Sequence, residues 1–183
     1  MSLADEVFAI YDQHGAAAYF GEAVSSTEHG LQAAYFAQRS GAPPALIVAA
    51  LLHDVGHLVQ HAPNDISEWQ ADAHHEQVGA AWLAQRFAPD VSEPVRLHVP
   101  AKRYLVATDD KYFAKLSPAS VVTLKLQGGP MAAHEIAQFE TEPFHRDAVR
   151  VRRWDDLGKV AGLTTPGLLD YRALIDSLGR LGI

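Results

Sequence analysis

The 183-residue sequence contains no cysteine. Disulfides, thiolate metal ligands and cysteine nucleophiles are therefore excluded, and any metal site must use His, Asp or Glu. The first residues show no charged-then-apolar signal pattern, and the sequence contains no apolar run of about 18 residues. We therefore expect a cytoplasmic protein without a membrane partner.

Excess positive charge is absent as well. The chain carries 15 Lys and Arg against 22 Asp and Glu, which gives a formal net charge of −7. This balance argues against an extended nucleic-acid-binding surface, so we expect a small-molecule partner and no nucleic acid. The sequence does not indicate an oligomeric state.

Alternating strand patterns are missing too, whereas apolar residues recur at helical spacing through most of the chain. The sequence predicts a single all-α domain over residues 1–183. Ser and Thr caps, glycines and prolines bound the expected helices. These helices are 3–14, 26–41, 42–58, 72–87, 91–108, 118–126, 131–139, 143–157 and 166–181, with a loop at 61–70.

The segment "LLHDVGHL" places His53, Asp54 and His57 inside the most apolar predicted helix, 42–58. At helical spacing His53 and His57 share a face, and Asp54 lies about 100° further round. A buried carboxylate and imidazole cost several kcal/mol unless they are compensated, and a divalent metal ion supplies the missing charge. The alternative is a hydrogen-bonded core histidine beside a capping aspartate.

Other candidate ligands lie on separate predicted helices: His29, His74, His75, His98 and Asp155. Each one alone fits a surface residue or a satisfied core residue. Four histidines and two aspartates together match the ligand set of a dinuclear non-heme site. One carboxylate must then bridge the metals, and Asp54 is best placed to do so.

The order of these residues resembles the HD superfamily of helical proteins, named for adjacent His-Asp metal ligands. The segments between them are more specific: "YFGEAVSSTEHGLQAAYFAQRSGA", "ALLHDVGHL", "HEQVGAAWL", "HVPAKRYL", "LQGGPM" and "RRWDDLGK". They are similar to the HD-domain diiron oxygenases that cleave hydroxylated aminoalkylphosphonates. The resemblance covers about residues 19–159.

This resemblance implies an HD-domain helical bundle with a central buried metal site. Two mixed-valent Fe(II)/Fe(III) ions would use dioxygen to cleave the carbon–phosphorus bond of (1R)-1-hydroxy-2-(trimethylammonio)ethylphosphonate or its 2-amino congener. The products would be phosphate and glycine betaine or glycine, and the "DAHHE" segment favours the trimethylated substrate. The implied ligands are His29, His53 and Asp155 for one iron, His75 and His98 for the other, and Asp54 between them.

Two cations share helical faces with expected ligands. Lys102 follows His98 by four residues, and Arg152 precedes Asp155 by three, so we predict that both bind the phosphonate. Solvated surface charge is the alternative for each of them. Gln127, before the "GGP" break, is a candidate to donate to the phosphonate or to cap its helix.

Tyr19 and Glu22 are three residues apart and are expected to face the site together. The resemblance implies that Tyr19 occupies an iron until substrate arrives and that Glu22 meets the substrate amine. A core tyrosine and a surface glutamate are the alternative. His57 is a candidate either to hydrogen-bond substrate or oxygen, or to orient a ligand. Aromatic candidates for an amine cage are Phe20, Tyr35, Trp69 and Tyr104.

Rival functions share this ligand set. An HD-type phosphohydrolase would cleave a nucleotide or small phosphate ester with metal-activated water, whereas a phosphonate offers carbon as the leaving group and requires oxidation first. An inositol-oxygenase-type diiron enzyme and a non-catalytic binding module are further alternatives. Dependence on dioxygen separates the first rival from the phosphonate oxygenase.

Overall fold

The computed structural model describes residues 1–60 and 74–180. Helices make up the regular structure of this described part, in which no strand is assigned, so the all-α prediction is confirmed. The α-helices are α1 (Leu3–His14), α2 (Ser26–Arg39), α3 (Pro44–Leu51), α4 (Val55–Gln60), α5 (His75–Ala84), α6 (Pro89–Arg96), α7 (His98–Thr108), α8 (Pro118–Leu126), α9 (Ala133–Thr141), α10 (His145–Leu157) and α11 (Arg172–Leu178). Two short 3₁₀-helices are η2 (Phe113–Lys115) and η3 (Leu168–Tyr171).

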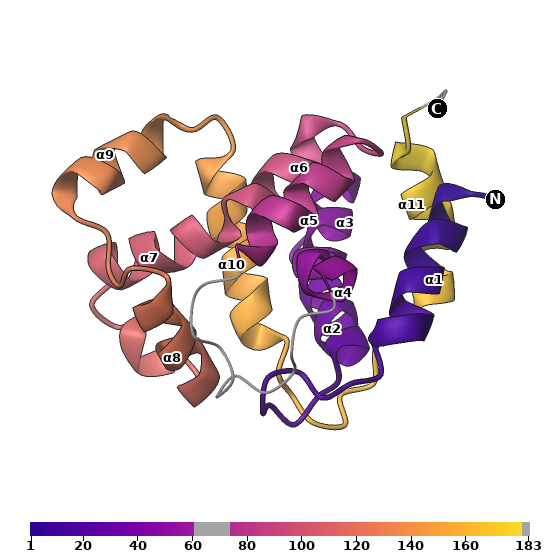
Figure 1. Ribbon diagram of the computed structural model, residues 1–183, viewed down its shortest axis with the longest axis horizontal. Coiled ribbons are helices and arrows are strands. Elements are labelled where there is room, and N and C mark those ends of the chain that lie inside the picture. Colours follow the sequence, from indigo (N-terminus) through magenta and orange to yellow (C-terminus); the bar gives the residue numbers. More distant parts are fainter. Residues whose placement is uncertain (61–73, 181–183) are drawn as a thin grey trace.

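Helix α10 runs through the middle of the molecule (Figure 1). It contacts α2 and α6 on one side and α7 on the other. Helices α7, α8 and α9 gather to one side of it, and α1 and α11 lie together at the opposite end of the molecule (Figure 1). This arrangement brings α2, α7 and α10, which are distant in sequence, around a common centre.

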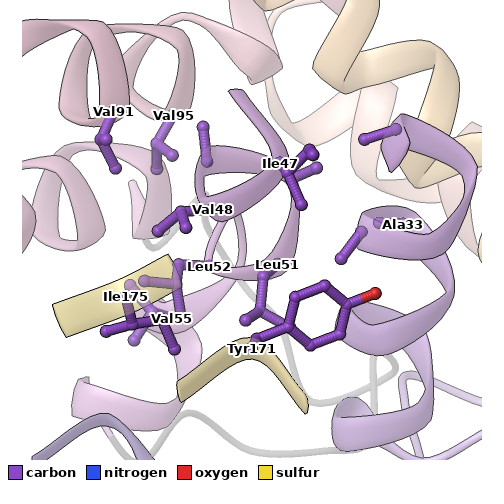
Figure 2. Close-up of a cluster of buried hydrophobic side chains, with 14 of the residues drawn as sticks. Ala33, Ile47, Val48, Leu51, Leu52, Val55, Val91, Val95, Tyr171 and Ile175 are labelled. Carbon is purple, nitrogen blue, oxygen red and sulfur yellow. The ribbon is translucent and has the colours of Figure 1, made fainter. Parts of the chain in front are cut away.

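Helix α3 is the centre of the hydrophobic core, as its uniformly apolar sequence predicts. All its residues after Pro44 are buried. Figure 2 shows Val48 facing Val91 and Val95 of α6, with Leu51 near Tyr171. Full burial of such a side chain contributes about 1.5–3 kcal/mol, so this packing fixes α3 firmly.

The prediction of one continuous helix over 42–58 is wrong. Helix α3 ends at Leu51, a turn follows at residues 52–54, and α4 begins at Val55. Side chains occupy the carbonyls that would continue the helix: the His53 ring lies 2.8 Å from the Ala50 oxygen, and the Tyr11 hydroxyl donates to the Leu51 oxygen at 2.8 Å. His53 and His57 therefore do not share one helix face.

The expected helix 91–108 is also divided, into α6 and α7, with the break at Leu97. Pro100 has no N–H to donate to the carbonyl of Arg96, so a continuous helix would lose a hydrogen bond there. The division makes His98 the first residue of α7. A ligand candidate therefore stands at a helix start.

The remaining boundaries follow the predictions within a few residues. The expected helix 72–87 is observed as α5, although its first two predicted residues lie outside the described chain. The predicted segment 166–181 divides into η3 and α11, and its last residue is not described. The loop predicted at 61–70 also lies outside the described residues. Among the described helices, none is both long and apolar enough to cross a membrane.

Candidate metal centre

All six predicted metal ligands converge between the helices. His29 comes from α2, His53 and Asp54 from the turn after α3, His75 from the start of α5, His98 from the start of α7, and Asp155 from α10. Their ligand atoms form two triads in which all atoms lie within 4.8 Å of one another. One triad is His29, His53 and Asp54, and the other is Asp54, His75 and His98.

Asp54 belongs to both triads through different oxygens. Its Oδ1 atom lies 3.2 Å from Nε2 of His75 and 3.5 Å from Nε2 of His98. Its Oδ2 atom lies 3.6 Å from Nε2 of His29 and 3.5 Å from Nε2 of His53. One carboxylate oxygen therefore faces each histidine pair, an arrangement that would allow Asp54 to bridge two cations.

Asp155 adds a second carboxylate to the first triad. Its Oδ1 atom lies 3.4 Å from Nε2 of His29, and its Oδ2 atom lies 3.8 Å from Nε2 of His53. The buried Oδ1 atom has no hydrogen-bond partner among the described residues. A metal ion would satisfy this oxygen.

The outer nitrogens of three histidines fix their tautomers. Nδ1 of His29 lies 2.9 Å from the Gly158 oxygen, Nδ1 of His53 lies 2.8 Å from the Ala50 oxygen, and Nδ1 of His98 lies 2.7 Å from the Val95 oxygen. A carbonyl only accepts, so Nδ1 carries the proton and Nε2 keeps its lone pair.

These lone pairs face one another inside the cage. Nε2 of His29 lies 3.0 Å from Nε2 of His53, and Nε2 of His75 lies 3.1 Å from Nε2 of His98. With Nδ1 protonated, the nitrogens of the first pair cannot hydrogen-bond each other while both rings are neutral. Ligands on one metal have such separations when each bond is about 2.1 Å long. The nitrogen and carboxylate donors thus fit a metal in each half of the cage.

Burial sets the protonation state of His53, and neighbouring groups set those of Asp54 and Asp155. Burial lowers the pKa of His53 to about 4, which keeps this imidazole neutral. Burial alone would raise the pKa of Asp54, but the surrounding imidazoles, His53 first, hold it well below its usual range. Asp155 is buried too, and the Arg152 guanidinium holds its pKa well below normal. Neutral imidazoles and charged carboxylates are the ligating forms.

Close backbone approach places His75. A Cβ atom added at Gly56 would lie 1.9 Å from the His75 carbonyl oxygen and 2.8 Å from the backbone nitrogen of Gly79. Only glycine permits this contact between α4 and α5. This contact positions His75, the first residue of α5, in the cage.

Tyr19 lies directly against the cage. Its hydroxyl donates to Asp54 Oδ2 at 2.6 Å, and its ring stacks on His29 with a centroid distance of 3.9 Å. Burial, with the charge of Asp54, raises the pKa of Tyr19 well above its ordinary value, so the phenol keeps its proton. The next residue, Phe20, has φ 43°, in the left-handed region that non-glycine residues rarely adopt.

A cavity of about 40 Å³ adjoins the cage and is lined by both ligand and non-ligand residues. Of the predicted catalytic and substrate-binding residues, it contains Tyr19, His57, Lys102, Gln127 and Arg152. His57 stacks on the His75 ring at a centroid distance of 3.8 Å. Glu22 does not line the cavity. Its Oε1 atom lies 3.6 Å from Nζ of Lys159, which does line it.

The two predicted phosphonate cations are buried rather than solvated. Lys102 donates from Nζ to Thr123 Oγ1 at 2.9 Å, and burial, reinforced by Arg152, lowers its pKa to about 7. Nη1 of Arg152 lies 2.7 Å from Asp155 Oδ2, and the guanidinium also contacts Asp156 and the Tyr112 hydroxyl. Arg152 thus connects the predicted ligand Asp155 to the cavity.

Sequence reasoning missed Ser120, Thr123 and Lys159, which also line the cavity. Ser120 Oγ accepts from Lys159 Nζ at 2.9 Å. A signal was available, because 120, 123 and 127 have the three-and-four spacing of one helix face. Lys159 likewise stands four residues after Asp155.

The other candidates lie apart from the site or outside the described chain. His74 is exposed and joins neither triad. Phe20 lines the cavity, whereas Tyr35 packs beside Phe36 and Tyr104 donates to Glu140. Trp69 is not among the described residues. Among the described candidates for an aromatic amine cage, Phe20 alone lines the cavity.

Gln127 lies both at the end of its helix and at the cavity. It is the C-cap of α8, and its side chain lines the cavity. Its Oε1 atom is buried and has no hydrogen-bond partner within residues 1–60 and 74–180. This unpaired amide oxygen at the cavity can accept a hydrogen bond from a ligand.

Comparison with known proteins places this cage in a family. The HD domain model matches residues 27–157. A hydroxymethylphosphonate dioxygenase of Gimesia maris is 46% identical over 172 residues, which are 93% of this chain and 85% of that protein. The glycine-betaine-forming [1-hydroxy-2-(trimethylamino)ethyl]phosphonate dioxygenase of Leisingera caerulea is 42% identical over 169 residues, 92% of this chain and 86% of that protein. An uncharacterized mimivirus protein, L432, is 33% identical over 168 residues, 91% of this chain and 77% of that protein. The chain therefore belongs to the HD-domain family, in the same branch as these phosphonate dioxygenases.

Proposed function

We propose that the protein is an iron-dependent oxygenase that cleaves the carbon–phosphorus bond of a 1-hydroxyalkylphosphonate and releases phosphate. The observation that carries this proposal is the position of a two-triad cage, joined by Asp54, beside a cavity lined by buried cations. The relatives at 46% and 42% identity, both named as phosphonate dioxygenases, support it.

The proposed cofactor is a mixed-valent Fe(II)/Fe(III) pair. His29, His53 and Asp155 would hold one iron, His75 and His98 the other, and Asp54 would bridge them. When bound, such a pair supplies the activation of dioxygen that oxidation of the hydroxylated carbon requires. The distances within the two triads support this division of the ligands.

The cations of the cavity bind and orient the phosphonate. Arg152 and Lys102 present N–H donors on the wall that also carries Asp155 and His98. Charge-assisted hydrogen bonds to phosphonate oxygens are roughly twice as strong as neutral ones. They would hold the hydroxylated carbon against the cage in one orientation, with Gln127 as a further donor or acceptor.

Tyr19 protects the cage before substrate binds. Its hydroxyl already contacts Asp54 Oδ2 and its ring covers His29. Substrate would displace the tyrosine and so open the site only when a productive reaction can follow. His57, stacked on His75, either contacts the substrate or orients that ligand.

The substrates we propose are (1R)-1-hydroxy-2-(trimethylammonio)ethylphosphonate and its 2-amino congener, with glycine betaine or glycine as the second product. Phe20 offers an aromatic face at the cavity, which suits a quaternary ammonium group. Hydroxymethylphosphonate, which the Gimesia maris relative is named for, shares the same reacting end.

The test is phosphate release from these phosphonates by iron-loaded enzyme, with and without dioxygen. We expect phosphate to form only with dioxygen and in step with its consumption. Release of phosphate from phosphate esters under anaerobic conditions, without turnover of the phosphonates, would instead identify a phosphohydrolase.

A further inference from the structure

Lys159 is a third cation at the cavity, and its contacts differ from those of Lys102 and Arg152. Its Nζ atom donates to Ser120 Oγ at 2.9 Å and to Ser117 Oγ at 3.4 Å. The carboxylate oxygens within 4.0 Å of it are Glu22 Oε1 at 3.6 Å and Asp155 Oδ1 at 4.0 Å. Within the described chain, its hydrogen bonds therefore go to neutral hydroxyls rather than to carboxylates.

The other two cations have less charge to offer an anion. Arg152 directly contacts the carboxylates of Asp155 and Asp156, which already balance its charge. Lys102 is deeply buried, and its pKa of about 7 leaves it only partly charged at neutral pH. Lys159 thus combines hydrogen bonds to hydroxyls with loose carboxylate contacts, at 3.6 and 4.0 Å, whereas Arg152 contacts its carboxylates directly.

Glu22 is the complementary half of this arrangement. Its Oε1 atom is buried and has no hydrogen-bond partner among the described residues. Its ion pair with Lys159 is longer than a hydrogen bond. Separating such a pair costs little when each charge gains a closer partner of opposite sign.

A zwitterionic hydroxyphosphonate offers both partners. We propose that Lys159 balances Glu22 before substrate binds and then exchanges this partner for the phosphonate, which frees Glu22 for the contact with the substrate amine that the family resemblance implies. This inference rests on the proposed function and adds Lys159 to it as a residue that determines specificity. A phosphonate without an ammonium group must instead compete with Glu22 for Lys159.

The test is calorimetric titration of the iron-loaded enzyme under nitrogen, where no turnover occurs. The two ligands are hydroxymethylphosphonate and 1-hydroxy-2-(trimethylammonio)ethylphosphonate. Lys159→Met should weaken binding of both ligands about tenfold or more, because each loses a charge-assisted hydrogen bond. Lys159→Arg should stay within about threefold of the wild type.

Glu22→Gln separates the two ligands, because it should change their binding affinities in opposite directions. It should weaken binding of the trimethylammonio ligand about tenfold and tighten binding of hydroxymethylphosphonate, because Lys159 loses its competing carboxylate. Lys125→Met removes an exposed lysine of α8 outside the cavity and is the matched control, with wild-type affinity for both ligands. Iron content and melting temperature are measured for every variant.

Equal effects of Glu22→Gln on the two ligands would overturn the partner exchange, and so would unaltered binding by Lys159→Met. If Lys159→Met loses iron or fails to fold, the Arg and Gln variants still decide the question. If the wild type binds neither phosphonate and releases no phosphate with dioxygen, the proposed function itself fails. If the wild type turns over the phosphonates but the variants bind both ligands with wild-type affinity, only the role of Lys159 is overturned.

Discussion

The Tyr19 hydroxyl lies where the two halves of the cage meet, 2.6 Å from Asp54 Oδ2. Replacing Tyr19 with phenylalanine removes this hydrogen bond and leaves the carboxylate oxygen open to other partners. We expect Tyr19→Phe to raise dioxygen consumption in the absence of substrate several-fold, because the metal site is less protected. An oxygen electrode measures this rate on iron-loaded enzyme, and an unaltered rate would contradict the protective role.

Lys102 predicts a pH dependence. Burial and Arg152 lower its pKa to about 7, so the side chain is charged below this pH and neutral above it. A neutral amine attracts a phosphonate weakly, and affinity should therefore fall as the pH rises through about 7. Lys102→Arg keeps its charge and should remove this part of the decrease.

Anaerobic titrations at pH 6, 7 and 8 compare the two proteins. Ionisation of the phosphonate itself is common to both, so the difference between their profiles reports on Lys102. Parallel profiles would show that its protonation does not control binding.

Single ligands could be predicted because imidazoles and carboxylates in apolar segments demand compensation, as at His53 and Asp54. The hydroxyls of Ser120 and Thr123 demand no such compensation, and their spacing from Gln127 indicates a shared helix face without indicating what that face contacts. The role of Ser120 depends on Lys159, from the chain after α10, and that of Thr123 depends on Lys102 of α7. Those contacts exist only in the folded chain.

Helix ends position the ligands, and they were the least predictable feature. The end of α3 depends on the Tyr11 hydroxyl, which reaches the Leu51 carbonyl from 40 residues away. No local pattern reveals such a contact. Pro100, by contrast, is visible in the sequence and indicates the break before α7. The prediction of a continuous helix there gave its apolar periodicity too much weight.

The close contact between α4 and α5 at Gly56 predicts that adding one methyl group there lowers stability and moves His75. In Gly56→Ala the new Cβ would lie 1.9 Å from the His75 carbonyl oxygen, and the atoms that it meets are backbone atoms of α5, which cannot move aside as a flexible side chain can. The helices must separate, which we expect to cost about 2 kcal/mol or more of unfolding free energy and to displace His75 from the cage. Thermal unfolding and iron analysis measure both effects.

Gly167→Ala is the matched control, because its Cβ would meet the nearest side-chain atom, Asp170 Oδ2, only at 3.8 Å. Its backbone φ of −85° is also accessible to alanine. Full iron content in Gly56→Ala would contradict the positioning of His75 by this contact.

The metal site and the stability of the whole chain are linked, because the ligands come from α2, α5, α7, α10 and the turn after α3. Without a metal, buried lone pairs and carboxylates at the centre lack compensation. A ligand at 100 times its dissociation constant stabilises the folded state by about 2.7 kcal/mol. Iron should therefore raise the melting temperature of metal-free protein by about 5 °C or more.

Calorimetric scans of His98→Ala and His134→Ala provide the comparison. His98 is a proposed ligand, whereas His134 is exposed on α9 and outside the cage. The stabilisation by iron should shrink in the first variant and persist in the second. If iron stabilised both variants equally, His98 would not be an iron ligand and iron would bind outside the proposed cage.

The all-α class followed from periodicity, and the set of six ligands followed from residue types together with the resemblance to the HD superfamily. The cavity did not, because its wall is assembled from α7, α8, α10 and the Tyr19 loop, whose mutual positions no sequence period encodes. The balance of charge within it, such as Lys159 beside Glu22, likewise emerges only from tertiary packing.

The central claim is that Asp54 joins two irons in one cage. Its most direct test combines iron analysis of the purified protein with electron paramagnetic resonance spectroscopy. We predict two irons per chain and the signal of an exchange-coupled Fe(II)/Fe(III) pair, which Asp54→Ala should abolish. A single iron per chain, or full activity with magnesium alone, would contradict the account.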